Sequence, residues 1–167
     1  MKKLYWDVSE SEGCIGYIGV SAKDTEVVSA GTTLYPMSVK DKNTEYQRYA
    51  DTYDLKFIFD DDIPQIGFYT VPRVGIFAKD SLGGLFGTIG KTTDIDDAAP
   101  ICYINKSKES FSIADSLKVF LKMLASEYDW RTNMTPNHNI VFYKSKVDAE
   151  NSLEFLKIRR EIENSDC

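Results

Sequence analysis

The stretch of sequence that decides the fold is Val74–Leu124, VGIFAKDSLGGLFGTIGKTTDIDDAAPICYINKSKESFSIADSLKVFLKML. It opens with two short runs of strand-forming residues, 74–79 (VGIFAK) and 84–90 (GLFGTIG). The turn-forming residues Ser81–Gly83 lie between these runs, which is the pattern of a β-hairpin. This part of the sequence therefore predicts two antiparallel strands joined by a tight turn.

The second half of the same stretch predicts a third strand and a helix. Pro100 precedes the apolar run 101–104 (ICYI), and residues 105–110 are predicted to form a turn. The helix is expected to begin at Ser112, because its hydroxyl can accept a hydrogen bond from the amide near Asp115. Residues at helical spacing then form one apolar stripe: Leu117, Phe120, Leu121 and Leu124.

Further strands are predicted on the N-terminal side of this stretch. The runs 4–8 (LYWDV) and 14–20 (CIGYIGV) resemble two strands joined by a polar turn, and a third strand is expected within 27–35. The alternating run 55–59 (LKFIF) and the run 66–71 (IGFYTV) predict two more. Together with the many aromatic residues, 13% of the chain, these runs predict a substantial sheet.

Two other segments follow a helical period. In 40–53, four residues fall on one helical face, Tyr46, Tyr49, Ala50 and Tyr53, and Asn43 or Thr44 is expected to cap this helix. A short strand at 140–143 is followed by a last helix capped by Ser145. On that helix a shared face is predicted for Ala149, Leu153, Leu156 and Arg160, with Phe155, Ile158 and Ile162 broadening it.

The length of 167 residues suits one domain, predicted over 1–163 with a loose tail at 164–167. The predicted fold class is α+β, with a central, mostly antiparallel twisted sheet flanked by helices. No internal repeat or linker divides the chain.

Charge and cysteine content limit the function and the location of the protein. The net charge of −6 argues against nucleic-acid binding, which needs a basic surface, and is compatible with a basic protein partner. No segment is long enough to span a membrane, and no apolar run follows the N-terminal lysines as in a signal peptide. The cysteines lie far apart, which predicts reduced thiols in a cytoplasmic protein, with Cys14 and Cys102 buried: Cys14, Cys102 and Cys167.

The segment 84–92 (GLFGTIGKT) resembles a phosphate-binding loop but lacks a required feature. The motif ends in Gly-Lys-Thr, here residues 90–92, and needs another glycine five residues before Gly90. Leu85 occupies that position. Aspartates and Pro100 follow where a helix N-terminus should face the phosphate. The glycines are therefore interpreted as residues of a turn and of close strand packing, and no nucleotide or other cofactor is predicted.

His138 is the single histidine of the chain, which excludes zinc sites that need two or three histidines. It could act as a base for Cys102, Cys14 or a serine, as in a small hydrolase. However, it lies in the polar loop 132–139 (TNMTPNHN), where an exposed histidine is expected, and no nucleophile motif accompanies it. No catalytic residue and no metal ligand are predicted.

Acidic clusters and a tryptophan are the predicted contacts for a protein partner. One acidic cluster is Asp60–Asp62, and the other lies in 94–97. Successive aspartates in loops are commonly solvated turn residues, but each cluster could also form a divalent-cation site or a contact patch for a basic protein. The run Asp94–Asp97 lacks the glycine and the distal glutamate of a calcium loop. Trp6 is expected in the core, whereas Trp130, beside Arg131, is expected to be exposed at an interface. The predicted partner-binding residues are Asp60, Asp61, Asp62, Asp94, Asp96, Asp97 and Trp130.

Residues 66–124 resemble the SUKH superfamily, which groups Smi/Knr-type cell-wall regulators of fungi with bacterial immunity proteins. The resemblance is carried by the following segments: VGIF (74–77) leading to GGLFG (83–87), PICYI (100–104), and IADSL (113–117) followed by Phe120 and Leu121. The chain opens with predicted strands where family members open with a helix, so it resembles a divergent member.

The resemblance implies an α+β binding module with a central antiparallel sheet flanked by helices and no shared catalytic residues. In bacteria such modules commonly neutralise a cognate toxin by binding it. The leading hypothesis is therefore a non-catalytic immunity-type protein whose acidic surface covers the basic active-site cleft of a toxin. Two alternatives remain: a regulator that binds a small ligand between the sheet and the helices, and the hydrolase that would use His138.

Overall fold

The computed structural model describes residues 5–6, 17–18, 32–34, 37–90, 99–126 and 129–165, with side chains in 37–90, 99–126 and 129–161. The predictions made for Cys14, Cys167, the side chain of Trp6 and residues 94–97 fall outside this part of the chain.

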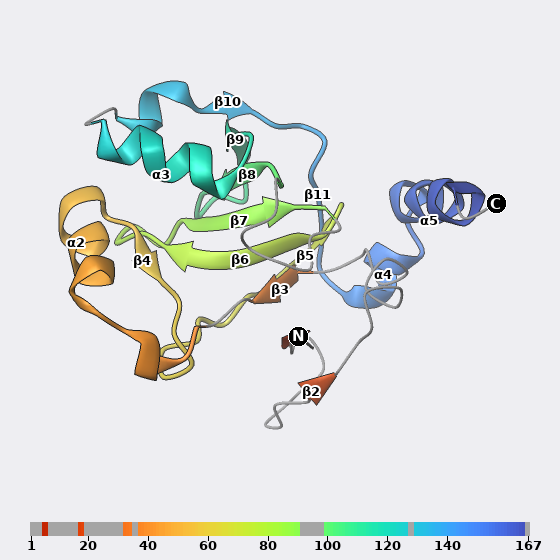
Figure 1. The fold of residues 1–167 in the computed structure, drawn as a ribbon. Coiled ribbons are helices and arrows are strands. Elements are labelled where there is room, and N and C mark those ends of the chain that lie inside the picture. Colours follow the sequence, from red (N-terminus) through yellow and green to blue (C-terminus); the bar gives the residue numbers. More distant parts are fainter. Residues whose placement is uncertain are drawn as a thin grey trace.

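The described strands form one large sheet and one small sheet (Figure 1). The large sheet contains β1 (Tyr5–Trp6), β2 (Tyr17–Ile18), β3 (Thr32–Leu34), β4 (Lys56–Phe57), β6 (Val74–Lys79), β7 (Leu85–Ile89), β8 (Ile101–Ile104), β9 (Ser110–Ala114) and β10 (Thr135–Pro136). Its order is β10-β9-β8-β7-β6-β3-β1-β2, and β4 also pairs with β6. The small sheet pairs β5 (Tyr69–Val71) with β11 (Val141–Tyr143). Among the pairs of described strands, only β3–β6 is parallel, so the prediction of an α+β fold with a mostly antiparallel sheet is confirmed.

Four α-helices and two 3₁₀-helices are described: α2 (Thr44–Tyr53), α3 (Leu117–Ala125), α4 (Lys146–Glu150), α5 (Leu153–Ser165), η2 (Val39–Asp41) and η3 (Trp130–Asn133). Figure 1 shows α3 alongside the sheet and α2, in orange, next to β4, with α4 and α5 at the opposite end. None of the helices in the described part combines the length and the apolar character that a membrane crossing would require.

The centre of the large sheet is buried on both faces. On β8, Ile101 and Tyr103 belong to the core that also contains α3, whereas Cys102 and Ile104 belong to a second core on the other face. This follows from the geometry of a strand, in which successive side chains point to opposite faces. It also explains why the runs 74–79 and 101–104 are almost continuously apolar, because neither face of these strands meets water.

The glycines of the apparent phosphate loop serve the hairpin between β6 and β7. Gly83, which immediately precedes this segment, adopts a left-handed φ of 86° in the turn, which favours glycine. At Gly84, the first residue of the segment, an added Cβ would meet the Tyr103 side chain. Gly87 lies within β7, where an added Cβ would meet the side chain of Val74 and lie 3.1 Å from the carbonyl oxygen of Gly75. The predicted hairpin and the structural interpretation of these glycines are thus confirmed.

Helix α2 forms where the tyrosine spacing predicts it. Its N-cap is Asn43, whose side chain accepts a hydrogen bond of 2.9 Å from the Glu45 amide. The half-buried residues of this helix are those of the predicted face: Tyr46, Tyr49, Ala50 and Tyr53. The helix ends at Asp54, which adopts a left-handed φ of 54°.

The predicted helix start at Ser112 is wrong. Residues 110–114 form strand β9, which pairs with β8 on one side and β10 on the other. Helix α3 begins three residues beyond β9, where the Ser116 hydroxyl accepts a hydrogen bond of 3.2 Å from the Val119 amide. A capping pattern exists at both Ser112 and Ser116. Only residues 110–114 pair with neighbouring strands, and this pairing makes them a strand instead of the start of a helix.

The single C-terminal helix predicted from Ser145 is also wrong. Ser145 does cap α4, but the helix stops at Asn151, and Ser152 starts α5 by accepting a 3.1 Å hydrogen bond from the Phe155 amide. This break changes the buried face, so that Ala149 and Phe155 are buried while Leu153 is 81% exposed. Helix α5 then extends through Ser165, two residues into the predicted tail.

Candidate functional site

A small groove lies between α2, β4 and the turn that follows β4, and we call it the α2 groove. Its volume is about 220 Å³. The residues used below are three aromatic rings (Tyr46, Phe57, Phe59), three carboxylates (Asp51, Asp61, Asp62) and two lysines (Lys42, Lys56). Pairing of β4 with the C-terminal half of β6 fixes one wall of this groove, and the capped helix α2 fixes the other.

The aromatic wall of the α2 groove is a set of edge-to-face contacts. The Tyr46 ring centroid lies 5.3 Å from that of Phe57 and 5.3 Å from that of Phe59, with interplanar angles of 72° and 88°. This arrangement is favoured because the positive edge of one ring meets the negative face of another. The Lys42 ammonium lies 5.2 Å from the centroid of Phe59, so a cation already contacts this wall.

The aspartates of the cluster 60–62 have different roles although they are consecutive. Asp60 is structural, because its carboxylate accepts a 3.0 Å hydrogen bond from the Val39 amide. Asp62 forms a 2.7 Å ion pair with Lys79. Asp61 lines the groove and has neither a hydrogen bond nor an ion pair with another described residue. The second predicted cluster, Asp94, Asp96 and Asp97, lies in the undescribed segment 91–98.

A second depression, the η3 hollow, lies between the end of α2 and η3 and has a volume of about 500 Å³. It shares Asp51 with the α2 groove, and its lining also includes Asp54, Asp129 and Arg131. Asp129 caps η3 by accepting a 3.1 Å hydrogen bond from the Arg131 amide. We call the carboxylates of both depressions the acidic face: Asp51, Asp54, Asp61, Asp62 and Asp129.

Three of these residues, Asp51, Asp54 and Asp129, were missed by the sequence prediction. Asp51 could have been found, because the tyrosine face of α2 places position 51 on the exposed side of that helix. Asp129 could not have been found in this way, since its proximity to α2 depends on how η3 packs after α3.

Asp54 joins the two depressions through several interactions. Its carboxylate accepts hydrogen bonds from the Ser81 amide at 3.0 and 3.1 Å and from the Ser81 hydroxyl at 2.6 Å. Lys56 and Arg131 lie within 3.8 and 3.9 Å of it. Partial burial works to raise the pKa of Asp54, but the Ser81 hydrogen bonds and the two cations outweigh it, so the pKa is lowered from its ordinary value.

This lowered pKa predicts a contribution of Asp54 to stability that depends on pH. Because the folded-state pKa lies below the unfolded value of 3.8, the contribution is complete above pH 3.8 and is lost as the pH falls through the folded-state pKa. In Asp54→Asn the free energy of unfolding should be lower near neutral pH and should fall less steeply in acid than in the wild type. Urea unfolding at a series of pH values measures this difference.

The matched control for this prediction is Asp61→Asn, which removes a carboxylate that has no hydrogen-bond partner in the described part of the chain. This variant should keep the acid dependence of the wild type. An Asp54→Asn variant with an unchanged pH profile would contradict the assigned role of the Ser81 hydrogen bonds.

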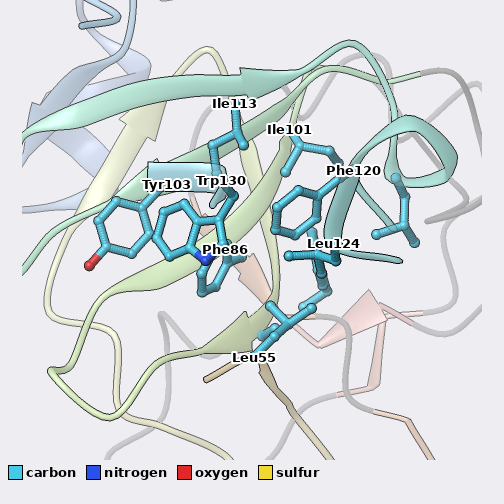
Figure 2. Close-up of a cluster of buried hydrophobic side chains, with 11 residues drawn as sticks. Leu55, Phe86, Ile101, Tyr103, Ile113, Phe120, Leu124 and Trp130 are labelled. Carbon is cyan, nitrogen blue, oxygen red and sulfur yellow. The ribbon is translucent and has the colours of Figure 1, made fainter. Parts of the chain in front are cut away.

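The predicted exposure of Trp130 is wrong, because this side chain is only 3% exposed. Figure 2 shows its indole among Phe86, Tyr103 and Phe120, and its ring centroid lies 5.0 Å from that of Phe86 and 5.1 Å from that of Tyr103. The cause is η3, which turns the chain back onto the sheet after α3. Arg131 remains exposed, and its guanidinium lies 4.4 Å from the indole centroid.

A buried polar network lies next to this aromatic core. The Tyr103 hydroxyl donates a 2.7 Å hydrogen bond to Asp80, whose carboxylate also accepts from the amides of Leu82 at 3.0 Å and Gly84 at 2.6 Å. Burial and the hydrogen bond to Asp80 raise the pKa of Tyr103 well above its ordinary value. The network closes the β6–β7 turn against β8, so its role is structural.

His138 is exposed, as predicted, beside a hollow of about 440 Å³. No serine or cysteine within the described ranges forms a hydrogen bond with it. Cys102 is fully buried, and burial raises the pKa of its thiol to about 12, so it is a neutral thiol near pH 7. The described residues therefore do not bring His138 and Cys102 together as a base and a nucleophile.

Within the described ranges, no three side chains of histidine, cysteine, aspartate or glutamate are grouped closely enough to hold a metal ion. The neighbouring carboxylates of the acidic face are instead hydrogen-bonded or paired with cations in several cases, as for Asp54 and Asp62. Their arrangement suits contact with a positively charged group better than coordination of a metal ion.

Comparisons of the chain with protein-family models, with curated proteins and with solved structures gave no match. The fold agrees with the class expected from the SUKH resemblance, but a fold class is shared by many unrelated functions. The resemblance therefore stays a prediction, and function is inferred from the acidic face.

Proposed function

We propose that this chain is a non-catalytic protein-binding module, an immunity-type protein of the SUKH kind, that neutralises a toxin by covering its basic cleft. The observation that carries the proposal is the acidic face, where aspartates from three separate segments line the aromatic-walled α2 groove and the neighbouring η3 hollow: Asp51 and Asp54 at α2, Asp61 and Asp62 after β4, and Asp129 before η3. A cytoplasmic location belongs to the same proposal.

The structure of the acidic face suits recognition of a basic partner. Asp51, Asp61 and Asp129 are exposed, so their charges can act on a partner during its approach. The underlying aromatic side chains are held by the core and would lose little conformational freedom on binding. The chain also carries an overall charge of −6, which favours association with a positively charged protein.

The contact residues proposed from the structure differ from those predicted from sequence. Asp61 and Asp62 remain as contacts, and Asp51 and Asp129 are added. Trp130 is buried and is no longer proposed as a direct contact. It instead supports the exposed Arg131, whose guanidinium lies over its ring. Asp94, Asp96 and Asp97 stay part of the proposal as sequence predictions.

The decisive experiment starts with capture of the partner from the source cell and measures association kinetics. Replacing Asp51, Asp61 and Asp129 together by asparagine should lower the association rate constant by roughly tenfold or more at low salt, because these charges steer the encounter. Asparagine retains the size of each side chain and can still cap η3. The captured protein should be toxic, carry a basic cleft and lose its toxicity in the presence of the wild-type chain.

The matched control removes three exposed acidic charges outside this face, by Glu109→Gln, Asp115→Asn and Asp148→Asn. The control should associate much faster than the acidic-face variant. Equal association rates for the two triple variants would exclude the acidic face as the contact surface, whatever the partner.

The regulator alternative is favoured by one observation, the size of the η3 hollow. Its volume of about 500 Å³ falls within the range of roughly 300–1,000 Å³ that is typical of small-molecule sites. A metabolite that raises the melting temperature of the wild type but not of Arg131→Ala would support this alternative.

A further inference from the structure

We infer that the α2 groove is a pocket for a single arginine side chain of a basic protein segment. This inference rests on the proposed function for the nature of the partner, but the pocket can be tested with small probes alone. It specifies which group anchors the partner and where on the acidic face that group binds.

The first support is the combination of aromatic rings and carboxylates around one small space. Tyr46 and Phe57 are half-buried, so part of each ring is open to the groove. An arginine guanidinium is planar and weakly hydrated, and it stacks on such rings while donating hydrogen bonds in its plane. The aromatic wall would hold the side chain, and the carboxylates at the rim would accept its donors.

The second support is the availability of one carboxylate. Asp62 is paired with Lys79, and Asp51 accepts a 2.8 Å hydrogen bond from the Gln47 side chain. Asp61 has no such interaction within the described ranges, although it lines the same groove. Asp61 is therefore the residue that we assign to a charge-assisted hydrogen bond with the guanidinium, in which two parallel N–H groups can bind one carboxylate.

The third support is a cation of the chain itself on the aromatic wall. The exposed Lys42 places its ammonium 5.2 Å from the Phe59 centroid, at the rim of the groove. This contact shows that the wall accepts a positive charge. It also means that Lys42 opposes an incoming cation by charge repulsion and by occupying part of the ring face.

The size of the groove selects one side chain over a larger ligand. Its volume of about 220 Å³ is smaller than the roughly 300–1,000 Å³ of typical small-molecule pockets. Lysine is a poorer occupant than arginine, because its compact ammonium is more strongly hydrated and cannot form the planar, two-donor contact.

The experiment is an NMR titration of the full chain with N-acetyl-arginine methylamide. The expected result is saturable binding with a dissociation constant on the order of 1–10 mM, which is reasonable for one side chain. Chemical shift changes should concentrate at Tyr46, Phe57 and Asp61. The corresponding citrulline compound, which has the same shape without the charge, and the lysine compound should bind more weakly.

Three variants test the assignment of residues. Asp61→Asn should weaken binding of the arginine compound by about five- to tenfold, because it removes a charge-assisted hydrogen bond. Lys42→Met, which keeps an unbranched side chain without its charge, should strengthen binding by about two- to fivefold, the range of one exposed cation–π contact. Glu45→Gln is the matched control, since Glu45 lies on α2 but outside the groove, and it should leave binding unchanged.

Several outcomes would overturn the inference: no saturable shift at the groove, equal binding of the citrulline or the lysine compound, or an unchanged affinity in Asp61→Asn. These outcomes are separable from failure of the proposed function. If the arginine compound binds as described but the captured partner is neither basic nor toxic, the pocket stands and the immunity function falls. If a basic toxin is neutralised through the acidic face but the arginine compound does not bind, only the pocket is wrong.

Discussion

Replacing Trp130 by alanine is expected to lower the free energy of unfolding by about 3–5 kcal/mol, the usual cost of removing a large buried aromatic side chain. The indole is 3% exposed and packs among Phe86, Tyr103 and Phe120, so its loss leaves a cavity where the sheet, α3 and η3 meet. Urea-induced unfolding measures the change, and it should appear whether or not a binding partner is present.

The control for this prediction is Trp130→Phe. It keeps an aromatic ring in the cluster and removes the indole N–H, which is buried and has no hydrogen-bond partner among the described residues. Burying an unpaired polar group costs about 1–3 kcal/mol, so removing it offsets part of the lost packing, and Trp130→Phe should destabilise much less than Trp130→Ala. A Trp130→Ala variant within about 0.5 kcal/mol of the wild type would instead indicate an exposed side chain, as the sequence alone predicted.

Asp80→Ala is expected to lower the free energy of unfolding by roughly 3–5 kcal/mol, because it breaks a buried hydrogen-bond network at the β6–β7 turn. The substitution leaves three donors without their acceptor: the Tyr103 hydroxyl and the amides of Leu82 and Gly84. Asp80 is 5% exposed, so water cannot easily replace the lost carboxylate. Urea unfolding near neutral pH provides the measurement.

Tyr103→Phe and Asp61→Ala are the comparison variants, and both should destabilise less than Asp80→Ala. Tyr103→Phe removes one of the hydrogen bonds to Asp80 and should cost roughly 1.5–3 kcal/mol, the range for a hydrogen bond to a charged group. Asp61→Ala removes an exposed carboxylate and should stay within about 0.5 kcal/mol of the wild type. If Asp80→Ala were no more destabilising than Asp61→Ala, the network would not contribute to stability.

The predictions that succeeded depend on local patterns with strong physical causes. The runs 74–79 and 101–104 were identified as strands with their observed bounds, because strands buried on both faces are continuously apolar and bounded by turn residues. The bounds of α2 follow from the Asn43 cap and the tyrosine spacing in the same way. Such signals lie within a few residues of the element that they define.

The predictions that failed depend on contacts between distant segments. Residues 110–114 carry a plausible capping pattern, but pairing with β8 and β10 makes them a strand. The face of α5 likewise depends on the break at Asn151–Ser152, which lets Phe155 reach the small core around Val71 and Ala149. A helical pattern in the sequence cannot show whether a sheet edge or a core lies within reach of the chain.

For the candidate site, the sequence alone determined the net negative charge, the aspartates after β4 and the tyrosine-rich helix, since these are properties of composition and spacing. Only the tertiary structure decided which carboxylates share a surface. It placed Asp129 near Asp51, assigned Asp60 to the backbone of Val39, and buried Trp130, because these outcomes depend on how α2, β4 and η3 pack around β6 and β7. Charge and helical period are properties of the local sequence, whereas proximity across a sheet follows from long-range strand pairing and burial. It is this proximity that makes these residues a candidate binding surface.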